Sequence, residues 1–126
     1  MKQIKNIRKA GFTLVEIMIV VAIIGLLAAI AIPNFVKARA TSQANACINN
    51  MRQIDSACDQ WALEAKKKTG DAIVFPDNLT PYIKLTTGSK IPSCPAGGTY
   101  GVGAVGDLPP VTCSLSSSVT PPHVMP

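Results

Sequence analysis

Several of the groups that catalytic and metal-binding sites use are scarce in this sequence of 126 residues. It has a single histidine, His123, no CxxC pair among its four cysteines, and only one acidic residue, Asp107, after Asp77. The missing CxxC pairs exclude the commonest zinc-binding and thioredoxin-like motifs, and one histidine without a fixed partner offers no Ser-His-Asp set. We therefore predict that the chain is not an enzyme and uses no metal or cofactor.

Charged residues are also few, at 15% of the chain. The formal net charge is +5, but four of the twelve cations lie in the first ten residues, at Lys2, Lys5, Arg8 and Lys9. Without those four, eight cations face seven acids. Such a near-neutral chain with few aromatic residues lacks the clustered cations that binding to a nucleic acid backbone requires. The basic leader instead favours a role in membrane orientation.

The sequence does contain one long apolar run. Leu14–Ile32 is interrupted only by Glu16 and Gly25, and as a helix it is about 28 Å long, close to the roughly 30 Å hydrocarbon core of a membrane. A secretory signal peptide is the alternative, but its apolar region is usually about 7–15 residues long. Here AAIAIPNF continues into a helical pattern without an A-x-A-like site at a clean end. We predict a retained transmembrane helix with a cytoplasmic N-terminus, because most nearby cations precede it.

The next segment, from Asn34 to about Lys67, has neither proline nor glycine. Its apolar residues recur in steps of three and four, which predicts one helical stripe: Cys47, Met51, Ile54, Cys58, Trp61 and Ala65. This stripe needs a partner surface, and the C-terminal segment is the available one.

The C-terminal segment contains signals for short elements. Asp77 or Asn78 is a candidate cap for a short helix carrying Leu79 and Ile83, and two short strands are expected at Thr99–Val105 and Pro110–Ser114. The predicted fold class is α+β. A long N-terminal helix, transmembrane in its first half and amphipathic in its second, packs on a small antiparallel sheet of two or three strands.

These patterns divide the chain into five segments. They are a basic leader at 1–11, the transmembrane half of the helix at 12–33, its amphipathic half at 34–69, a small α+β domain at 70–113, and a Ser/Pro-rich tail at 114–126. We expect the tail to be mobile and His123 to be solvated there.

The cysteines suggest one disulfide. Cys94 and Cys113 flank a Gly/Pro-rich stretch that suits a bridge if this region lies outside the cytoplasm. Cys47 and Cys58 lie about 16 Å apart on one helix, beyond the roughly 7 Å Cα separation that a disulfide allows. We predict a Cys94–Cys113 disulfide with Cys47 and Cys58 as buried thiols. A bridge from the helix to a tail cysteine is the alternative.

The stretch KAGFTLVEIMIVVAIIGLLAAIAIPNF, which begins at Lys9, resembles the N-terminus of type IV pilins and of the pseudopilins of type II secretion. The resembling parts are a basic leader ending in Gly11, then Phe12, Glu16 at the fifth place after the glycine, the apolar run and Pro33. CPAGGTY at 94–100 resembles a motif of small pseudopilin-like proteins. The resemblance implies that a prepilin peptidase cuts between Gly11 and Phe12 and methylates the new amine of Phe12.

The resemblance also gives Glu16 and Pro33 a role in assembly. A carboxylate buried unpaired in an apolar bundle is costly, and the ammonium that cleavage creates on Phe12 is a matching partner. The alternative is that Glu16 reaches the membrane interface without a partner. Pro33 lacks an N–H group, so the helix should kink or loosen there.

The expected function is that of a structural subunit of a pilin-like filament. Its short C-terminal domain favours a pseudopilin of a type II secretion pseudopilus, whose partners are other pilin or pseudopilin subunits and an inner-membrane assembly platform. The expected location is the bacterial inner membrane, with the C-terminal domain in the periplasm, and then a periplasmic or extracellular filament. The alternative is a minor type IV pilin that binds DNA in a competence pilus.

Overall fold

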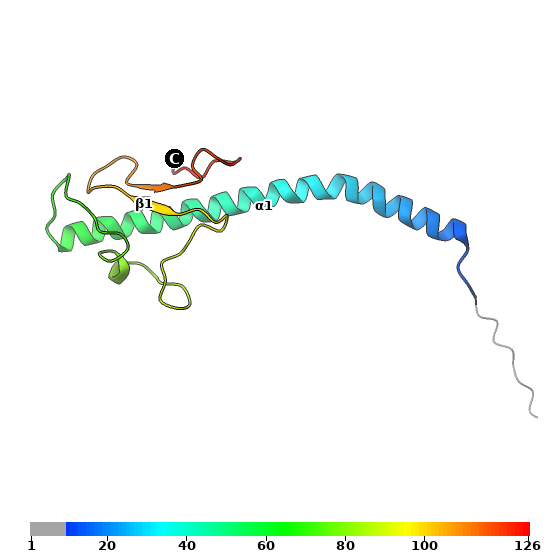
Figure 1. Ribbon diagram of the computed structural model, residues 1–126, viewed down its shortest axis with the longest axis horizontal. Helices are drawn as coiled ribbons and strands as arrows, with labels where there is room; N and C mark the ends of the chain where they lie inside the picture. Colours follow the sequence, from blue (N-terminus) through cyan, green and yellow to red (C-terminus); the bar gives the residue numbers. More distant parts are fainter. Residues whose placement is uncertain (1–9) are drawn as a thin grey trace, which may run out of the picture. The chain divides into compact units, whose positions relative to one another are not determined.

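The computed structural model describes residues 10–126, so the leader cations at 2–9 lie outside the described residues. The elements in chain order are α1 (Leu14–Glu64), the 3-10 helix η1 (Thr80–Tyr82), β1 (Tyr100–Val102) and β2 (Val111–Cys113) (Figure 1). The chain divides into two compact units, with the boundary between Val36 and Lys37. Each unit is described by itself.

The first unit contains the N-terminal part of α1. Every Leu, Ile, Val, Met and Phe side chain from Leu14 to Val36 is at least 49% exposed. An 18-residue window of α1 has a mean hydropathy of 2.9, and none of it is buried within the protein. By length and composition, the helix is therefore able to cross a membrane, as the apolar run predicts. Pro33 lies inside α1 and does not interrupt its helical assignment.

The second unit contains the rest of α1, which is buried along one stripe. Ala44, Cys47, Met51, Ile54, Ala57 and Cys58 are the buried residues of the helix. The predicted stripe is confirmed at its first four positions, whereas Trp61 is half-buried and Ala65 is exposed beyond the end of the helix. Figure 1 shows the two strands lying alongside this part of α1, which supplies the stripe with its partner surface.

The C-terminal end of α1 is closed by backbone hydrogen bonds. The N–H of Lys67 donates to the Ala62 carbonyl at 2.8 Å, and the N–H of Lys66 donates to the Leu63 carbonyl at 3.3 Å. These two bonds form the Schellman motif, with Lys66 in the left-handed conformation at a φ of 51°. The helix therefore ends a few residues before the predicted Lys67.

The segment after the helix covers the stripe with apolar side chains. Leu79 and Ile83, which flank η1, are buried against it. The predicted cap at Asp77 or Asn78 is wrong, because Leu79 occupies the N-cap position and no side chain makes a capping bond. Instead, the N–H groups of Leu79 and Thr80 both donate to the Pro76 carbonyl, at 3.1 Å each.

The sheet has two antiparallel strands in the described residues, with Tyr100 opposite Cys113 and Val102 opposite Val111. The strands are shorter than predicted. The Gly103 N–H still donates to the Pro110 carbonyl at 2.8 Å, but a proline has no N–H to return to the ladder. The fold is thus α+β and pilin-like, with a long helix packed on a small two-stranded sheet.

Candidate functional site

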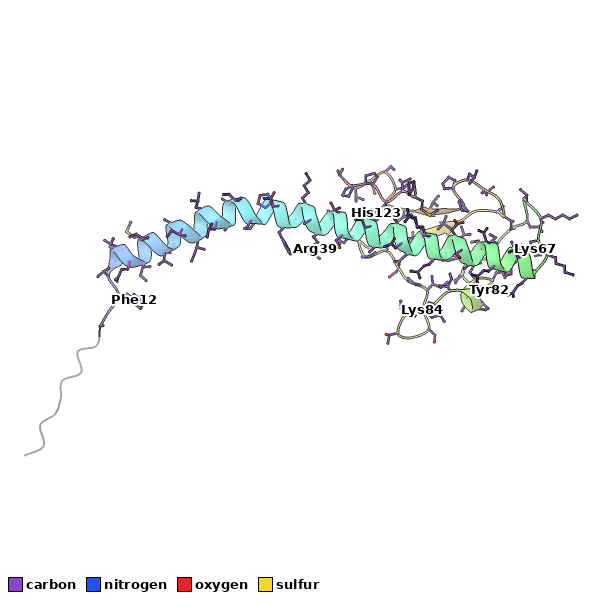
Figure 2. The ribbon with its side chains drawn as sticks, turned by 180° about the vertical axis from the view of Figure 1, so that it is seen from behind. Phe12, Arg39, Lys67, Tyr82, Lys84 and His123 are labelled. Carbon is purple, nitrogen blue, oxygen red and sulfur yellow. The ribbon has the colours of Figure 1, made fainter. Side chains whose placement is uncertain are left out.

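The N-terminal segment before α1 holds the predicted processing bond. Gly11 and Phe12 precede the helix and are both exposed, Phe12 by 86%. Figure 2 shows Phe12 just before the first turn of α1. A peptide bond in such an exposed, non-helical segment is sterically accessible to a peptidase.

The first turn of α1 is capped by a reciprocal pair of hydrogen bonds. The Thr13 N–H donates to Glu16 Oε2 at 2.7 Å, and the Glu16 N–H donates to Thr13 Oγ1 at 3.3 Å. This arrangement is a capping box, which satisfies two N–H groups that a helix start otherwise leaves unpaired. The T-x-x-E spacing that signals it is readable in the sequence, whereas the roles predicted for Glu16 were assembly or a position at the membrane interface.

A second candidate site lies within the second unit. The sulfur atoms of Cys47, Cys94 and Cys113 and a ring nitrogen of His123 all lie within 4.8 Å of one another, and all four residues are buried. We call these four residues the Cys3His cluster. Cys47 comes from the stripe of α1, Cys94 from the loop before β1, and Cys113 ends β2. His123 comes from the C-terminal segment and lies beside α1 (Figure 2).

His123 corrects the predicted mobile tail. It is 2% exposed, and its Nδ1 lies 3.3 Å from the sulfur of Cys94. The prediction that it is solvated is wrong, because the C-terminal segment folds back and places the imidazole against the sulfur of Cys94. Met125, two residues further on, also packs against the core. The segment is therefore part of the second unit at least as far as Met125.

The backbone of the loop that carries Cys94 lies close to cysteine sulfur atoms. The Cys94 carbonyl accepts a hydrogen bond from the Gly97 N–H at 3.0 Å, and Gly97 adopts a φ of 86°, which favours glycine. A Cβ on Gly98 would lie 2.8 Å from the Cys113 sulfur, so only glycine allows this close approach. Burial raises the pKa of Cys94, but N–H groups of Ala96 and Gly98 that donate to its sulfur lower it overall.

Cys47 lies in a less polar environment. Burial raises its pKa to about 12, and contacts with the thiols of Cys94 and Cys113 add to the increase, whereas the Tyr100 hydroxyl opposes it. Burial, and then the Cys47 sulfur, raise the pKa of Tyr100 as well. Asn50 Nδ2 donates to Tyr100 Oη at 3.2 Å and to the Ser93 carbonyl at 3.1 Å, which ties α1 to the loop.

All four cysteines are free thiols in this structure. The sulfur atoms of Cys94 and Cys113 lie within 4.8 Å of each other, so the two residues converge, and the disulfide between them stays a prediction. Cys58 is buried, as predicted, but lies outside the cluster. Burial raises its pKa to about 11, with smaller contributions from Asp55 and Asp59. Cys47 is buried too, but its sulfur faces two other thiols, which the stripe pattern did not indicate.

Residues 6–32 match the family model of the prokaryotic N-terminal methylation motif. Among curated proteins, the type IV major pilin protein PilA of Myxococcus xanthus is 56% identical over 52 residues, which is 41% of this chain and 24% of that protein. The type IV major fimbrial protein FimA of Dichelobacter nodosus is 48% identical over 63 residues, 50% of this chain and 39% of that protein.

The chain is also similar to a secretion protein. The type II secretion system core protein G of Pectobacterium carotovorum is 33% identical over 57 residues, 45% of this chain and 36% of that protein. The chain thus spans between a quarter and two fifths of the length of these relatives. No solved structure matches it significantly.

Proposed function

We propose, from the premise that this chain is a homologue of type IV pilins and type II secretion pseudopilins, that it is a structural subunit of a pilin-like filament. The observation that carries the proposal is the exposed apolar half of α1, most of which lies within the methylation motif at residues 6–32. A contiguous apolar surface of this extent is unstable in water and needs lipid or a protein partner. Membrane anchoring and then filament assembly provide these two environments in turn.

Processing at Gly11–Phe12 precedes assembly in this proposal. A prepilin peptidase cuts the exposed bond on the cytoplasmic side and methylates the amine of Phe12. The remaining chain is a single-pass membrane protein with its second unit in the periplasm. It leaves the membrane when an assembly platform adds it to a filament of other pilin or pseudopilin subunits.

Glu16 has two roles in this sequence of events. Its carboxylate accepts the Thr13 N–H and so caps α1, and both residues remain after cleavage at Gly11. In the filament, the same carboxylate faces an apolar bundle, where an unpaired charge is costly. Pairing with the ammonium of Phe12, on its own or a neighbouring subunit, offsets that cost and fixes the axial register.

Within this class we propose a pseudopilin of a secretion filament. The support is the similarity to the type II secretion system core protein G over 57 residues. A minor type IV pilin is the second candidate, and the higher identities to major type IV pilins favour the type IV class over the secretion class without supporting the minor role. Deletion in the native host tests the choice, because a pseudopilin mutant loses protein secretion, whereas a pilin mutant loses surface filaments and keeps secretion.

The processing step is tested by intact-mass analysis of the protein from its native host. The expected mature chain begins at N-methylated Phe12. A full-length species starting at Met1, or an N-terminus after Ile32, would contradict the proposed peptidase substrate. A Gly11→Asp variant is the matched control, since it changes the predicted cleavage position but none of the described contacts of α1, and it should accumulate uncleaved.

A further inference from the structure

We propose that Cys47, Cys94, Cys113 and His123 bind one Zn²⁺ ion as a structural site in the second unit. The proposal is independent of the filament role. It rests on the convergence of three sulfur atoms and one imidazole nitrogen within 4.8 Å, all from buried residues.

The donor set matches the chemistry of zinc. Three thiolates and a histidine form one of the tetrahedral sets that structural zinc sites use. With Zn–S bonds of about 2.3 Å, the ligand atoms of such a site are separated by roughly 3.8 Å. The 3.3 Å between His123 Nδ1 and the Cys94 sulfur is slightly shorter than that separation, and the 4.8 Å limit for the cluster is slightly longer, so small shifts of the ligand atoms would produce that geometry. Calcium and magnesium prefer oxygen ligands, and no carboxylate belongs to the cluster.

The surrounding groups also fit a metal-bound thiolate. The N–H groups of Ala96 and Gly98 point at the sulfur of Cys94, and donors of this kind stabilise the charge of a coordinated thiolate. Tyr100 faces Cys47 and is held by Asn50. Each of these groups comes from the loop, β1 or α1, so the outer shell is built from the same elements as the ligands.

A disulfide would involve only two of the four donor atoms of the cluster. It joins two of the three sulfurs at about 2.05 Å and leaves a third buried thiol and a buried imidazole without a comparable partner. It also requires an oxidant to accept two electrons and two protons. Zinc binding requires no oxidant, because three thiols release three protons to solvent and the neutral imidazole contributes a lone pair. All four donors are then used, and the site has no open position for catalysis.

The site would stabilise a unit that has few other sources of stability. A small domain with a limited core commonly needs a metal or disulfides. One zinc ion would join α1, the Cys94 loop, the end of β2 and the C-terminal segment, four parts of the chain that are remote in sequence. Zinc binding would therefore contribute directly to folding.

The test uses the full chain, purified in detergent under reducing conditions and then titrated with Zn²⁺ or Co²⁺. We expect one metal ion per chain by elemental analysis. Bound Co²⁺ should show the visible absorption of a tetrahedral site and a thiolate-to-cobalt charge-transfer band. A chelator should lower the thermal midpoint of the second unit, followed by Trp61 fluorescence, by about 10 °C or more.

Three variants make the test specific. Cys58→Ser removes a buried thiol outside the cluster and should keep one metal ion per chain, whereas Cys94→Ser should keep none. His123→Cys replaces the imidazole with a fourth thiolate and should keep the metal with a stronger charge-transfer band. A misfolded chain cannot give that last result, so the variant separates loss of a ligand from loss of the fold.

Two results would overturn the proposal. One is a metal content that is unchanged in Cys94→Ser. The other is zinc-free protein from the native host whose non-reducing peptide map joins two cluster cysteines, since that result assigns the cluster to a disulfide. Zinc recovered with the native protein, together with alkylation of Cys47, Cys94 and Cys113 only after chelation, supports the site.

Discussion

The two halves of α1 differ in where their apolar side chains find a partner. From Leu14 to Val36 all large apolar side chains are at least 49% exposed, while Met51 and Ile54 in the second half are fully buried. Both halves belong to one uninterrupted helix, so helix formation does not explain the difference. The second half is covered by residues between 73 and 125 of the same chain, whereas the described residues provide no cover for the first half. Its burial has to come from outside the described residues.

The largest expected effect comes from truncating one isoleucine in each half. Ile54→Ala should lower the free energy of unfolding of the second unit by about 2–5 kcal/mol, because it leaves a cavity in the core. Ile24→Ala should change it by less than about 0.5 kcal/mol, since Ile24 is 61% exposed. Denaturant unfolding in detergent, followed by the fluorescence of Trp61, measures both. Equal losses in the two variants would show that the first half has a partner within the chain.

The second effect concerns filament assembly and uses Glu16 in the first half. Glu16→Gln keeps a side-chain acceptor for the Thr13 N–H, so the capping box survives, but it removes the charge. Glu16→Ala removes both. If the charge pairs with Phe12 in the filament, both variants should reduce filament yield by about tenfold or more. Neither should change the unfolding of the second unit.

Filament yield is compared at matched membrane levels of each variant. Normal yield from Glu16→Gln with a reduced yield from Glu16→Ala would assign Glu16 to capping alone. Normal yield from both would leave the carboxylate without a role in assembly. In either case the processing of Gly11–Phe12 is measured separately by intact mass, so a cleavage defect is not mistaken for an assembly defect.

The sequence was sufficient to predict the helix and its two kinds of surface, because hydrophobic periodicity records which face is buried. Cys47 was correctly placed on that face together with Met51 and Ile54. Its proximity to Cys94 and Cys113 was not predictable in the same way, since spacing rules detect ligands that are close in sequence. Here the donors come from four separate segments, and their meeting depends on how the loops fold.

The tail shows a second limit of sequence reasoning. Its composition predicts disorder. Composition cannot predict that one histidine contacts a buried cysteine sulfur, and this contact is what places the tail against the domain. His123 is therefore the residue whose environment was predicted least well. By contrast, the capping box at Thr13 and Glu16 depends only on local spacing and was available from the sequence. Interactions within one helical turn can be predicted from residue spacing in the sequence, whereas interactions between distant segments cannot.

The smallest expected effect comes from an acid beside the buried stripe of the second half. Asp55 is half-buried, and burial, followed by repulsion from Asp59, raises its pKa above the ordinary value of 3.8. A carboxylate whose pKa is higher in the folded state than in the unfolded state destabilises the fold once it is ionised. The penalty is absent below the unfolded pKa and is complete above the folded pKa, so it is fully present at pH 7.

Asp55→Asn should therefore raise the thermal midpoint at pH 7 by about 2 °C, and the gain should vanish below about pH 3.8. Asp77→Asn is the matched control, because Asp77 is exposed and its replacement should leave the midpoint unchanged. Thermal melts of the three proteins across this pH range measure the difference. In the first half the only acid, Glu16, is exposed within the chain, so its burial would become costly only on assembly. A gain from Asp55→Asn that persists at low pH would mean that Asp55 acts through packing, and the penalty would then not be one of charge.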